Sequence, residues 1–167
     1  MTDSGLPQRS GSFRAVVQSG TTVTAYLRIG RGRPVLLLRH GSSPLPAWDA
    51  LLETLSDSWR VVAPEVPVEP SRLGGWLTGF LDGLGLADTA AVADPALSAA
   101  LLTFVRTEPQ RISRLVVLTS GHSAPPEAAA APIPCQVLDL SLPAEDLVAE
   151  AAWFLSGAPD RLDTSPQ

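Results

Sequence analysis

Pro34-Val-Leu-Leu-Leu-Arg-His-Gly41 is the stretch of this 167-residue sequence that decides its fold. A run of four apolar residues bounded by a proline and a polar turn predicts a short strand buried on both faces of a sheet. Later stretches have the same character: residues 60–63, 89–93 and 114–118, and a strand that begins at Cys135 and ends at Leu140. Together they predict a sheet made largely of parallel strands.

Helical spacing of apolar residues separates these strands. Apolar stripes over residues 48–55, 73–84, 95–107 and 143–156 predict four helices, with Ser71 as an N-cap and Gly85 and Gly157 as stops. Ahead of them, residues 13–18 and 22–29 predict two strands joined by Ser19-Gly20 in a hairpin. A hairpin followed by alternating strands and helices predicts an α/β fold, with a mostly parallel sheet covered by helices on both faces.

The length of the chain suits one domain with a substantial core. We expect a polar N-terminal tail over residues 1–12, a single domain over residues 13–157 and a C-terminal tail over residues 158–167. The first residues lack the apolar core of a secretory signal, and no apolar run reaches the length of a membrane span. A cytoplasmic location without membrane contact is therefore the default expectation.

Composition excludes several classes of function. The net charge of −5 and the pI near 4.9 argue against nucleic-acid binding, which needs a basic face. All 12 basic residues are arginine, which indicates the codon bias of a GC-rich bacterial genome. A single cysteine excludes an internal disulfide, and two histidines leave little material for a metal site. We therefore expect neither a metal nor another cofactor.

Several stretches resemble segments of the α/β-hydrolase family. Pro34 to Gly41 is similar to the strand that leads into the family's His-Gly oxyanion loop, and Trp59-Arg-Val-Val-Ala-Pro-Glu-Val-Pro67 is similar to its next strand. Trp76-Leu-Thr-Gly-Phe-Leu-Asp-Gly-Leu-Gly-Leu86 resembles the helix before the nucleophile strand. Glu108-Pro-Gln-Arg-Ile-Ser-Arg-Leu-Val-Val-Leu118 resembles the segment that leads into the sixth strand. Their order and spacing imply a minimal, three-layer version of that fold.

The family carries its catalytic serine in a G-x-S-x-G turn between a strand and a helix. The matching stretch here is Ala93-Asp94-Pro95-Ala96-Leu97, with Pro95 at the serine position. Proline fixes φ near about −65° and has no side-chain oxygen, so it supplies neither the strained turn nor a nucleophile. The stretch instead predicts an ordinary helix start with Asp94 as N-cap. The resemblance implies that this carboxylate lies where the family binds a developing oxyanion.

The other parts of the family's catalytic site are also hard to find. The resemblance implies an acid after the strand that ends at Leu140, a histidine after one further strand, and a cap after the sixth strand. Here Ser141-Leu142 leads straight into the last helix, so we expect the cap, the last strand and the histidine loop to be missing. Asp139 falls inside the strand rather than beyond it. The expected protein is a degenerate α/β-hydrolase fold without serine hydrolase activity.

Two side chains remain as catalytic candidates. His40 is expected to face the former pocket, where it could act as an acid or base, although a structural role in pinning its loop is the favoured interpretation. Asp94 could act as a general base, but helix capping explains both its type and its position. Ser98 is expected to face solvent or to bond the carbonyl four residues earlier rather than act as a nucleophile. Candidate pocket residues from this turn and from segments that follow strands are Gly41, Ser42, Ser43, Glu65, Ala96, Ser120 and His122.

Two classes of function fit this sequence. The first is an accessory protein that binds a small molecule or a protein partner. The second is a non-hydrolytic lyase, isomerase or cyclase that acts on an acyl or polyketide-like molecule, with His40 as acid or base. Convergence of His40, Asp94 and His122 on one closed pocket would favour the enzyme, and a shallow open groove would favour the accessory role.

Loss of the family's last strand has a consequence for partners. It would leave the strand from Cys135 to Leu140 with an open edge, which proteins normally cover or pair. We therefore expect a homodimer or a heteromeric partner that binds through this edge or through the last helix.

Overall fold

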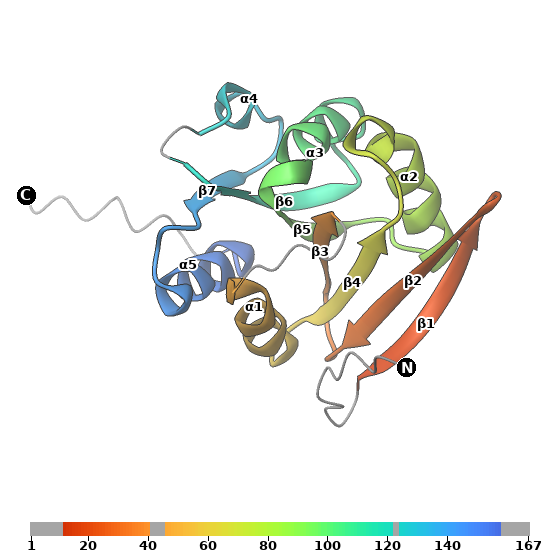
Figure 1. Ribbon diagram of the computed structural model, residues 1–167, viewed down its shortest axis with the longest axis horizontal. Helices are drawn as coiled ribbons and strands as arrows, with labels where there is room; N and C mark the ends of the chain where they lie inside the picture. The colour runs from red at the N-terminus through yellow and green to blue at the C-terminus, as the bar shows by residue number, and fades with distance from the viewer. Residues whose placement is uncertain (1–11, 41–45, 122–123, 158–167) are drawn as a thin grey trace, which may run out of the picture.

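The computed structural model describes residues 12–40, 46–121 and 124–157 of the chain. Their strands form a single sheet in the order β1-β2-β4-β3-β5-β6-β7 (Figure 1). The seven strands of the described residues are β1 (Phe13–Ser19), β2 (Thr22–Ile29), β3 (Pro34–His40), β4 (Arg60–Val66), β5 (Thr89–Ala93), β6 (Ile112–Thr119) and β7 (Cys135–Asp139). The predicted α/β fold is confirmed.

The sheet is antiparallel at one edge and parallel over the rest. β1 pairs with β2, and β2 with β4, in antiparallel register. β3 pairs in parallel with both β4 and β5, and β6 pairs in parallel with β5 and β7. Because β3 to β7 run in the same direction, their carboxyl ends meet along one edge of the sheet, where open parallel sheets bind their ligands.

Helices cover both faces of the sheet (Figure 1). The helices on one face are α1 (Pro46–Ser56) and α5 (Ala144–Leu155), and those on the other are α2 (Leu73–Leu84), α3 (Pro95–Thr107) and the short α4 (Pro126–Ala129). Alternation along β3 divides its apolar side chains between the two faces. Val35 and Leu37 pack in the core beneath α1 and α5. Leu36 and Leu38 pack in the core beneath α2 and α3.

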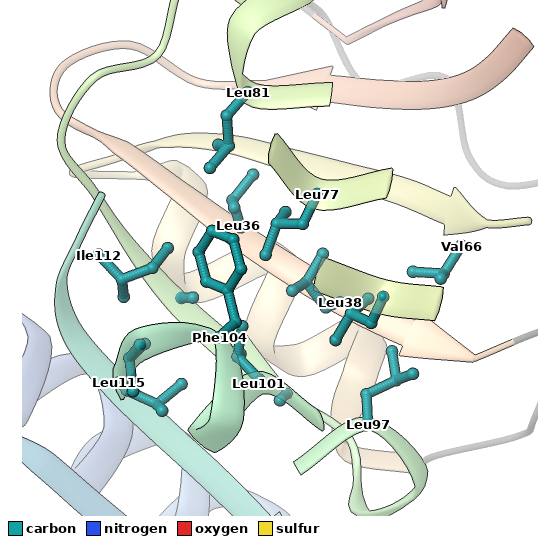
Figure 2. Close-up of a cluster of buried hydrophobic side chains, with 14 of the residues drawn as sticks. Leu36, Leu38, Val66, Leu77, Leu81, Leu97, Leu101, Phe104, Ile112 and Leu115 are labelled. Atoms are coloured by element: carbon teal, nitrogen blue, oxygen red, sulfur yellow. The ribbon is translucent and has the colours of Figure 1, made fainter. Parts of the chain in front are cut away.

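The larger core lies between the sheet and helices α2 and α3 (Figure 2). Phe80 of α2 is fully buried there, and its ring stacks on Trp76 with 5.0 Å between ring centroids. The same ring meets Tyr26 of β2 edge-on at 6.0 Å. The indole Nε1–H of Trp76 donates to Thr24 Oγ1 at 2.9 Å, so the polar atom of this buried ring is satisfied. These aromatic rings pack α2 against the antiparallel edge of the sheet.

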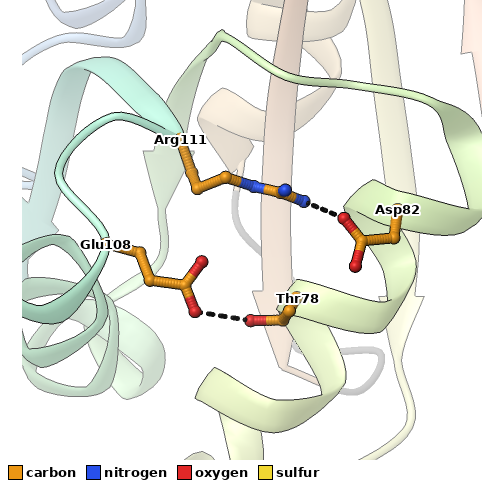
Figure 3. A network of polar contacts seen from close by, with 4 residues as sticks. All are labelled: Thr78, Asp82, Glu108 and Arg111. Carbon is orange, nitrogen blue, oxygen red and sulfur yellow. Dashed lines mark hydrogen bonds and ion pairs between the residues drawn. The ribbon is translucent and has the colours of Figure 1, made fainter.

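Two polar contacts join α2 to the segment between α3 and β6 (Figure 3). Arg111 donates to Asp82 Oδ1 at 2.7 Å, and Thr78 Oγ1 donates to Glu108 Oε1 at 3.1 Å. The Asp82 side chain is 60% exposed, so solvent screens its ion pair with Arg111 and the pair adds little stability. Apolar packing therefore contributes most to the position of α2.

The start of α2 differs from the prediction. Ser71 is not its N-cap, because Ser71 lies in a short 3₁₀ helix, η1 (Pro70–Arg72), that runs directly into α2. α2 begins at Leu73, and Arg72 at its N-cap position makes no side-chain capping bond. Gly85 ends α2 as predicted, with a φ of 67° in the left-handed region that glycine tolerates.

Two connections also differ from the prediction. Ser19 belongs to β1 and pairs with Thr22, so Gly20 and Thr21 form the hairpin turn. The segment between β6 and β7, where no helix was predicted, contains the short helix α4. As expected, β7 passes through residues 140–143 directly into α5.

Replacing Phe80 with alanine tests the assignment of the larger core. We expect the Phe80→Ala variant to lose about 3–5 kcal/mol of unfolding free energy, because a fully buried ring leaves a cavity that packed neighbours cannot close. Urea unfolding followed by tryptophan fluorescence measures this loss. Phe13 is 47% exposed, so Phe13→Ala is the matched control and is expected to cost about 1 kcal/mol or less. Equal losses in the two variants would contradict the assignment.

Candidate functional site

The turn between β5 and α3 has ordinary backbone geometry. β5 is buried along its whole length, and the Asp94 N–H donates to the Leu38 carbonyl of β3 at 3.0 Å. Asp94 is extended, with φ −67° and ψ 167°, and Pro95 opens the helix. Outside glycine, no described residue has a positive φ. This turn therefore lacks the contorted backbone that holds a nucleophilic serine above a sheet.

The Asp94 carboxylate lies buried between the end of β3 and the first turn of α3, with 2% of the residue exposed. Its Oδ1 accepts the Leu97 N–H at 3.0 Å, which confirms the predicted capping role. Its Oδ2 accepts the His40 N–H at 2.8 Å. The partial positive charge at a helix N-terminus favours an anion at this position. Asp94 thus fixes α3 to the central strand β3.

The positions of these two N–H groups can be compared with those of the oxyanion donors in the α/β-hydrolase fold. In the α/β-hydrolase fold, oxyanion donors come from the helix that follows the nucleophile strand and from the loop that follows the third strand. Here the Leu97 N–H lies in the first turn of the matching helix, and the His40 N–H lies at the end of β3. Both N–H groups, which lie beside the family's donor positions, donate to a carboxylate of the same chain.

Ser98, one turn inside α3, is the hydroxyl nearest to this turn along the helix. Its Oγ lies within donor distance of two carbonyl oxygens, that of Asp94 at 2.8 Å and that of Leu118 at 3.1 Å. The residue is 3% exposed. The contact with the carbonyl four residues earlier is one of the two arrangements predicted for this serine. The hydroxyl is bonded within the fold rather than presented to a substrate.

A groove lies beside this turn, at the carboxyl ends of β5 and β6. We call it the carboxyl-end groove; its volume is about 340 Å³. Its walls are Pro95, Ser98 and Ala99 from α3, Leu118 and Thr119 from β6, and Ser120, Gly121 and Pro125 from the segment that follows β6. This is the edge of the sheet at which α/β folds bind ligands.

A second, smaller cavity lies on the other face of the sheet. We call it the side cavity; its volume is about 120 Å³, and strands β1 to β4 and helix α1 line it. Its charged lining residues are Arg14, Arg39, Asp49 and Glu65. The Arg39 guanidinium also lies over the ring of Trp48, with 5.8 Å between the guanidinium carbon and the ring centroid.

The two catalytic candidates meet each other but reach neither cavity. His40 is the last residue of β3, is partly buried, and contacts Asp94 through its backbone N–H. Neither residue belongs to the lining of the carboxyl-end groove or of the side cavity. His122, the third residue expected to converge here, lies outside the described residues.

The candidate pocket residues fall into three groups: those that line a cavity, one that lines neither cavity, and those outside the described residues. Ser120 lines the carboxyl-end groove, and Glu65 lines the side cavity. Ala96 lines neither cavity and is exposed on α3. The remaining candidates that fall outside the described residues are Gly41, Ser42 and Ser43.

Sequence reasoning missed several groove residues. Thr119 ends β6, directly before the predicted Ser120, and Ala99 lies four residues after Pro95 on the same side of the helix. Both positions follow from the predicted strand end and the helical period. Pro125 had no such signal, because its place depends on the path of the segment between β6 and α4.

The described residues form neither a reactive thiol nor a metal-binding cluster. Burial raises the pKa of the Cys135 thiol to about 11, so the thiol is protonated at neutral pH and is a poor nucleophile. Residues 12–40, 46–121 and 124–157 contain no group of three or more His, Cys, Asp or Glu side chains placed to hold a metal ion. Within the same residues, every helix is too short or too polar to cross a bilayer.

No protein-family model matches this chain, and no curated protein matches it closely. Many solved structures resemble it in fold. A membrane phospholipase A described as a bacterial virulence factor is 18% identical, with a TM-score of 0.59 over 70% of this chain and 42% of its own. Carboxylesterase CesB from Bacillus subtilis is 18% identical, with a TM-score of 0.58 over 68% of this chain and 47% of its own. Haloalkane dehalogenase DatA from Agrobacterium tumefaciens C58 is 16% identical, with a TM-score of 0.56 over 65% of this chain and 41% of its own.

These structures share the α/β-hydrolase fold, and so does this chain. The resemblance seen in the sequence is therefore confirmed for the fold. This chain spans less than half the length of each of the three structures, between 41% and 47%. At such low identity the likeness shows the fold and not the activity.

Substitution of Asp94 tests its structural role. We expect Asp94→Ala to lower the unfolding free energy by about 2–4 kcal/mol, because the helix loses its cap and two backbone N–H groups lose their acceptor. Asp94→Asn should cost less, since an amide oxygen still accepts one of the two N–H groups. Urea unfolding measures both losses. Exposed Asp88 provides the control variant Asp88→Asn, which should change stability by no more than about 0.5 kcal/mol. An Asp94→Ala variant as stable as the control would refute the capping role.

Proposed function

We propose that this protein is a non-hydrolytic accessory protein that binds a small molecule in the carboxyl-end groove. The observation that carries the proposal is the buried Asp94 carboxylate, which accepts the N–H groups of His40 and Leu97. These N–H groups lie next to the positions from which the α/β-hydrolase fold draws its oxyanion donors, which are the residue after the nucleophile and the loop after the third strand. A site already occupied by a fixed anion cannot stabilise a second anion on a substrate.

Acyl transfer through this turn would also lack its other parts. The reaction needs a nucleophile, an adjacent base and free donors for the developing oxyanion. Pro95 has no side-chain oxygen, and the Ser98 hydroxyl is bonded to backbone carbonyl oxygens. No described histidine makes a hydrogen bond to Ser98. Each of these observations supports a protein that binds rather than hydrolyses.

The alternative of a lyase, isomerase or cyclase that uses His40 has less support. General acid–base catalysis requires the imidazole to reach the substrate within hydrogen-bond distance. His40 lines neither the carboxyl-end groove nor the side cavity. The groove itself, at about 340 Å³, falls within the usual range of small-molecule sites of about 300–1,000 Å³.

We also propose that the chain associates with a second copy through β7. Within the described residues β7 pairs with β6 alone and forms the edge of the sheet. Leu140 N–H donates to the Thr119 carbonyl, and Leu115 N–H donates to the Pro134 carbonyl, so even-numbered residues direct their backbone groups toward β6. By strand alternation the N–H and C=O of Val137 point away from the sheet. Such groups can form hydrogen bonds with a strand of another chain.

Fluorophosphonate labelling tests the absence of serine hydrolase chemistry. We expect no covalent modification of any serine under conditions that fully label an active serine esterase treated in parallel. Pro95→Ser restores a hydroxyl at the turn and should also stay unlabelled, because Asp94 still caps α3 and holds the His40 N–H, which leaves a buried anion beside the new hydroxyl. Stoichiometric labelling of one serine in the native chain would overturn the proposed function.

Light scattering at micromolar concentration tests the β7 association. We expect the native chain to have the mass of a dimer and Val137→Pro to have the mass of a monomer, because proline removes the outward N–H and leaves the β6 pairing intact. Val137→Thr keeps that N–H and should remain dimeric. A monomeric native chain, or a dimer unaffected by Val137→Pro, would refute the interface.

A further inference from the structure

We propose that the side cavity binds a small aliphatic α-amino acid as its zwitterion, because side chains of both charges and an apolar floor line it. The cavity lies on the face of the sheet that α1 covers, and its described lining shares no residue with the carboxyl-end groove. This site is independent of the proposed function, which concerns the groove alone.

The pairing of two strands places a positive and a negative side chain together at one end of the cavity. Arg39 of β3 and Glu65 of β4 are direct neighbours in parallel register. By strand alternation, Arg39 shares the face of Leu37 and Glu65 that of Ala63, both of which pack beneath α1. Within the described part of the chain, neither Arg39 nor Glu65 forms an ion pair. Both charges are therefore available to a ligand.

A tryptophan ring holds the Arg39 guanidinium in place. Trp48 of α1 is 4% exposed, and the guanidinium carbon lies over its ring, 5.8 Å from the centroid. A guanidinium that stacks through its planar face keeps the N–H groups of its edge, which bind a carboxylate in pairs. Arg39 is thus the group that receives the carboxylate of the amino acid.

A second acid and a second base line the same cavity. Asp49 lies in the first turn of α1, directly after Trp48, and Arg14 lies on β1; both are exposed. A ligand with a single charge is repelled by two of the four lining charges, whereas a zwitterion has a partner for each of its own. The ammonium of the ligand has Glu65 and Asp49 as partners.

The floor of the cavity suits an aliphatic side chain. Leu27 of β2 and Ala63 of β4 are neighbours in antiparallel register, and Leu52 of α1 is half-buried beside them in the lining. Removal of apolar surface from water favours an aliphatic group there. The cavity volume is about 120 Å³. A cavity of about 150 Å³ holds one benzene molecule, so a branched aliphatic group suits this one better than an indole ring.

Three matched ligands test the recognition of both charges. Leucine has both, leucinamide lacks the carboxylate, and N-acetylleucine lacks the ammonium. We expect leucine to bind the native chain with a Kd at least about tenfold lower than that of either analogue, a difference of about 1.4 kcal/mol. Heteronuclear NMR titrations of the isotope-labelled protein give the three constants. Equal constants, or no binding of leucine, would overturn the proposal.

Two alanine-to-tryptophan variants locate the binding. Ala25 is exposed in the side cavity, and Ala99 is exposed in the carboxyl-end groove. Ala25→Trp should abolish the binding of leucine, and Ala99→Trp should leave it unchanged. Leucine binding that survives Ala25→Trp would refute the side cavity as its site and leave the proposed function of the groove untouched.

Two charge variants test the roles of Arg39 and Glu65 separately. Glu65 is exposed, and Glu65→Gln should reduce the preference for leucine over N-acetylleucine to about threefold or less while the preference over leucinamide remains. Arg39→Gln should have the opposite effect and reduce only the preference over leucinamide. Exposed Arg106 on α3 provides the control Arg106→Gln, which should keep both preferences. Retention of both preferences in Glu65→Gln would contradict the assigned ammonium partner, even if Arg39→Gln fails to fold.

Discussion

The Asp94 carboxylate makes the interaction on which this structure depends most. It accepts N–H groups from the end of β3 and from the first turn of α3, and it is almost completely buried. A buried carboxylate is stable only where its oxygens are hydrogen-bonded, and both oxygens here are. The same two bonds align the central strand with a helix that packs in the larger core.

This arrangement gives α3 a capped, unstrained start. In an active α/β hydrolase, strain in the nucleophile turn and unsatisfied donors are kept for the transition state. Here Pro95 opens an unstrained helix start, and Asp94 accepts two N–H groups that lie beside the family's donor positions. The sheet and the carboxyl-end groove are present, and the N–H groups of His40 and Leu97 are bonded to a carboxylate of the chain itself.

Much of the fold could be predicted because its signals are local. The apolar run of β3 and the helical stripe of α3 depend only on neighbouring residues, and the predicted helix over 95–107 agrees with the structure. The prediction that Ser71 caps α2 was wrong because a cap-forming residue also suits a 3₁₀ turn. Packing against the rest of the fold decides which of the two structures forms. Of the candidate site, Asp94 was correctly predicted as a cap from the proline that follows it.

The sequence by itself determined that the turn at Pro95 is an ordinary helix start, because a ring-fixed φ and a missing hydroxyl are properties of a single residue. Only the tertiary structure decided that the second carboxylate oxygen of Asp94 binds the His40 N–H, 54 positions earlier in the chain. Such a contact depends on the pairing of β3 with β5, and no local pattern encodes it. The separation of His40 from both cavities follows in the same way from how strands and helices pack.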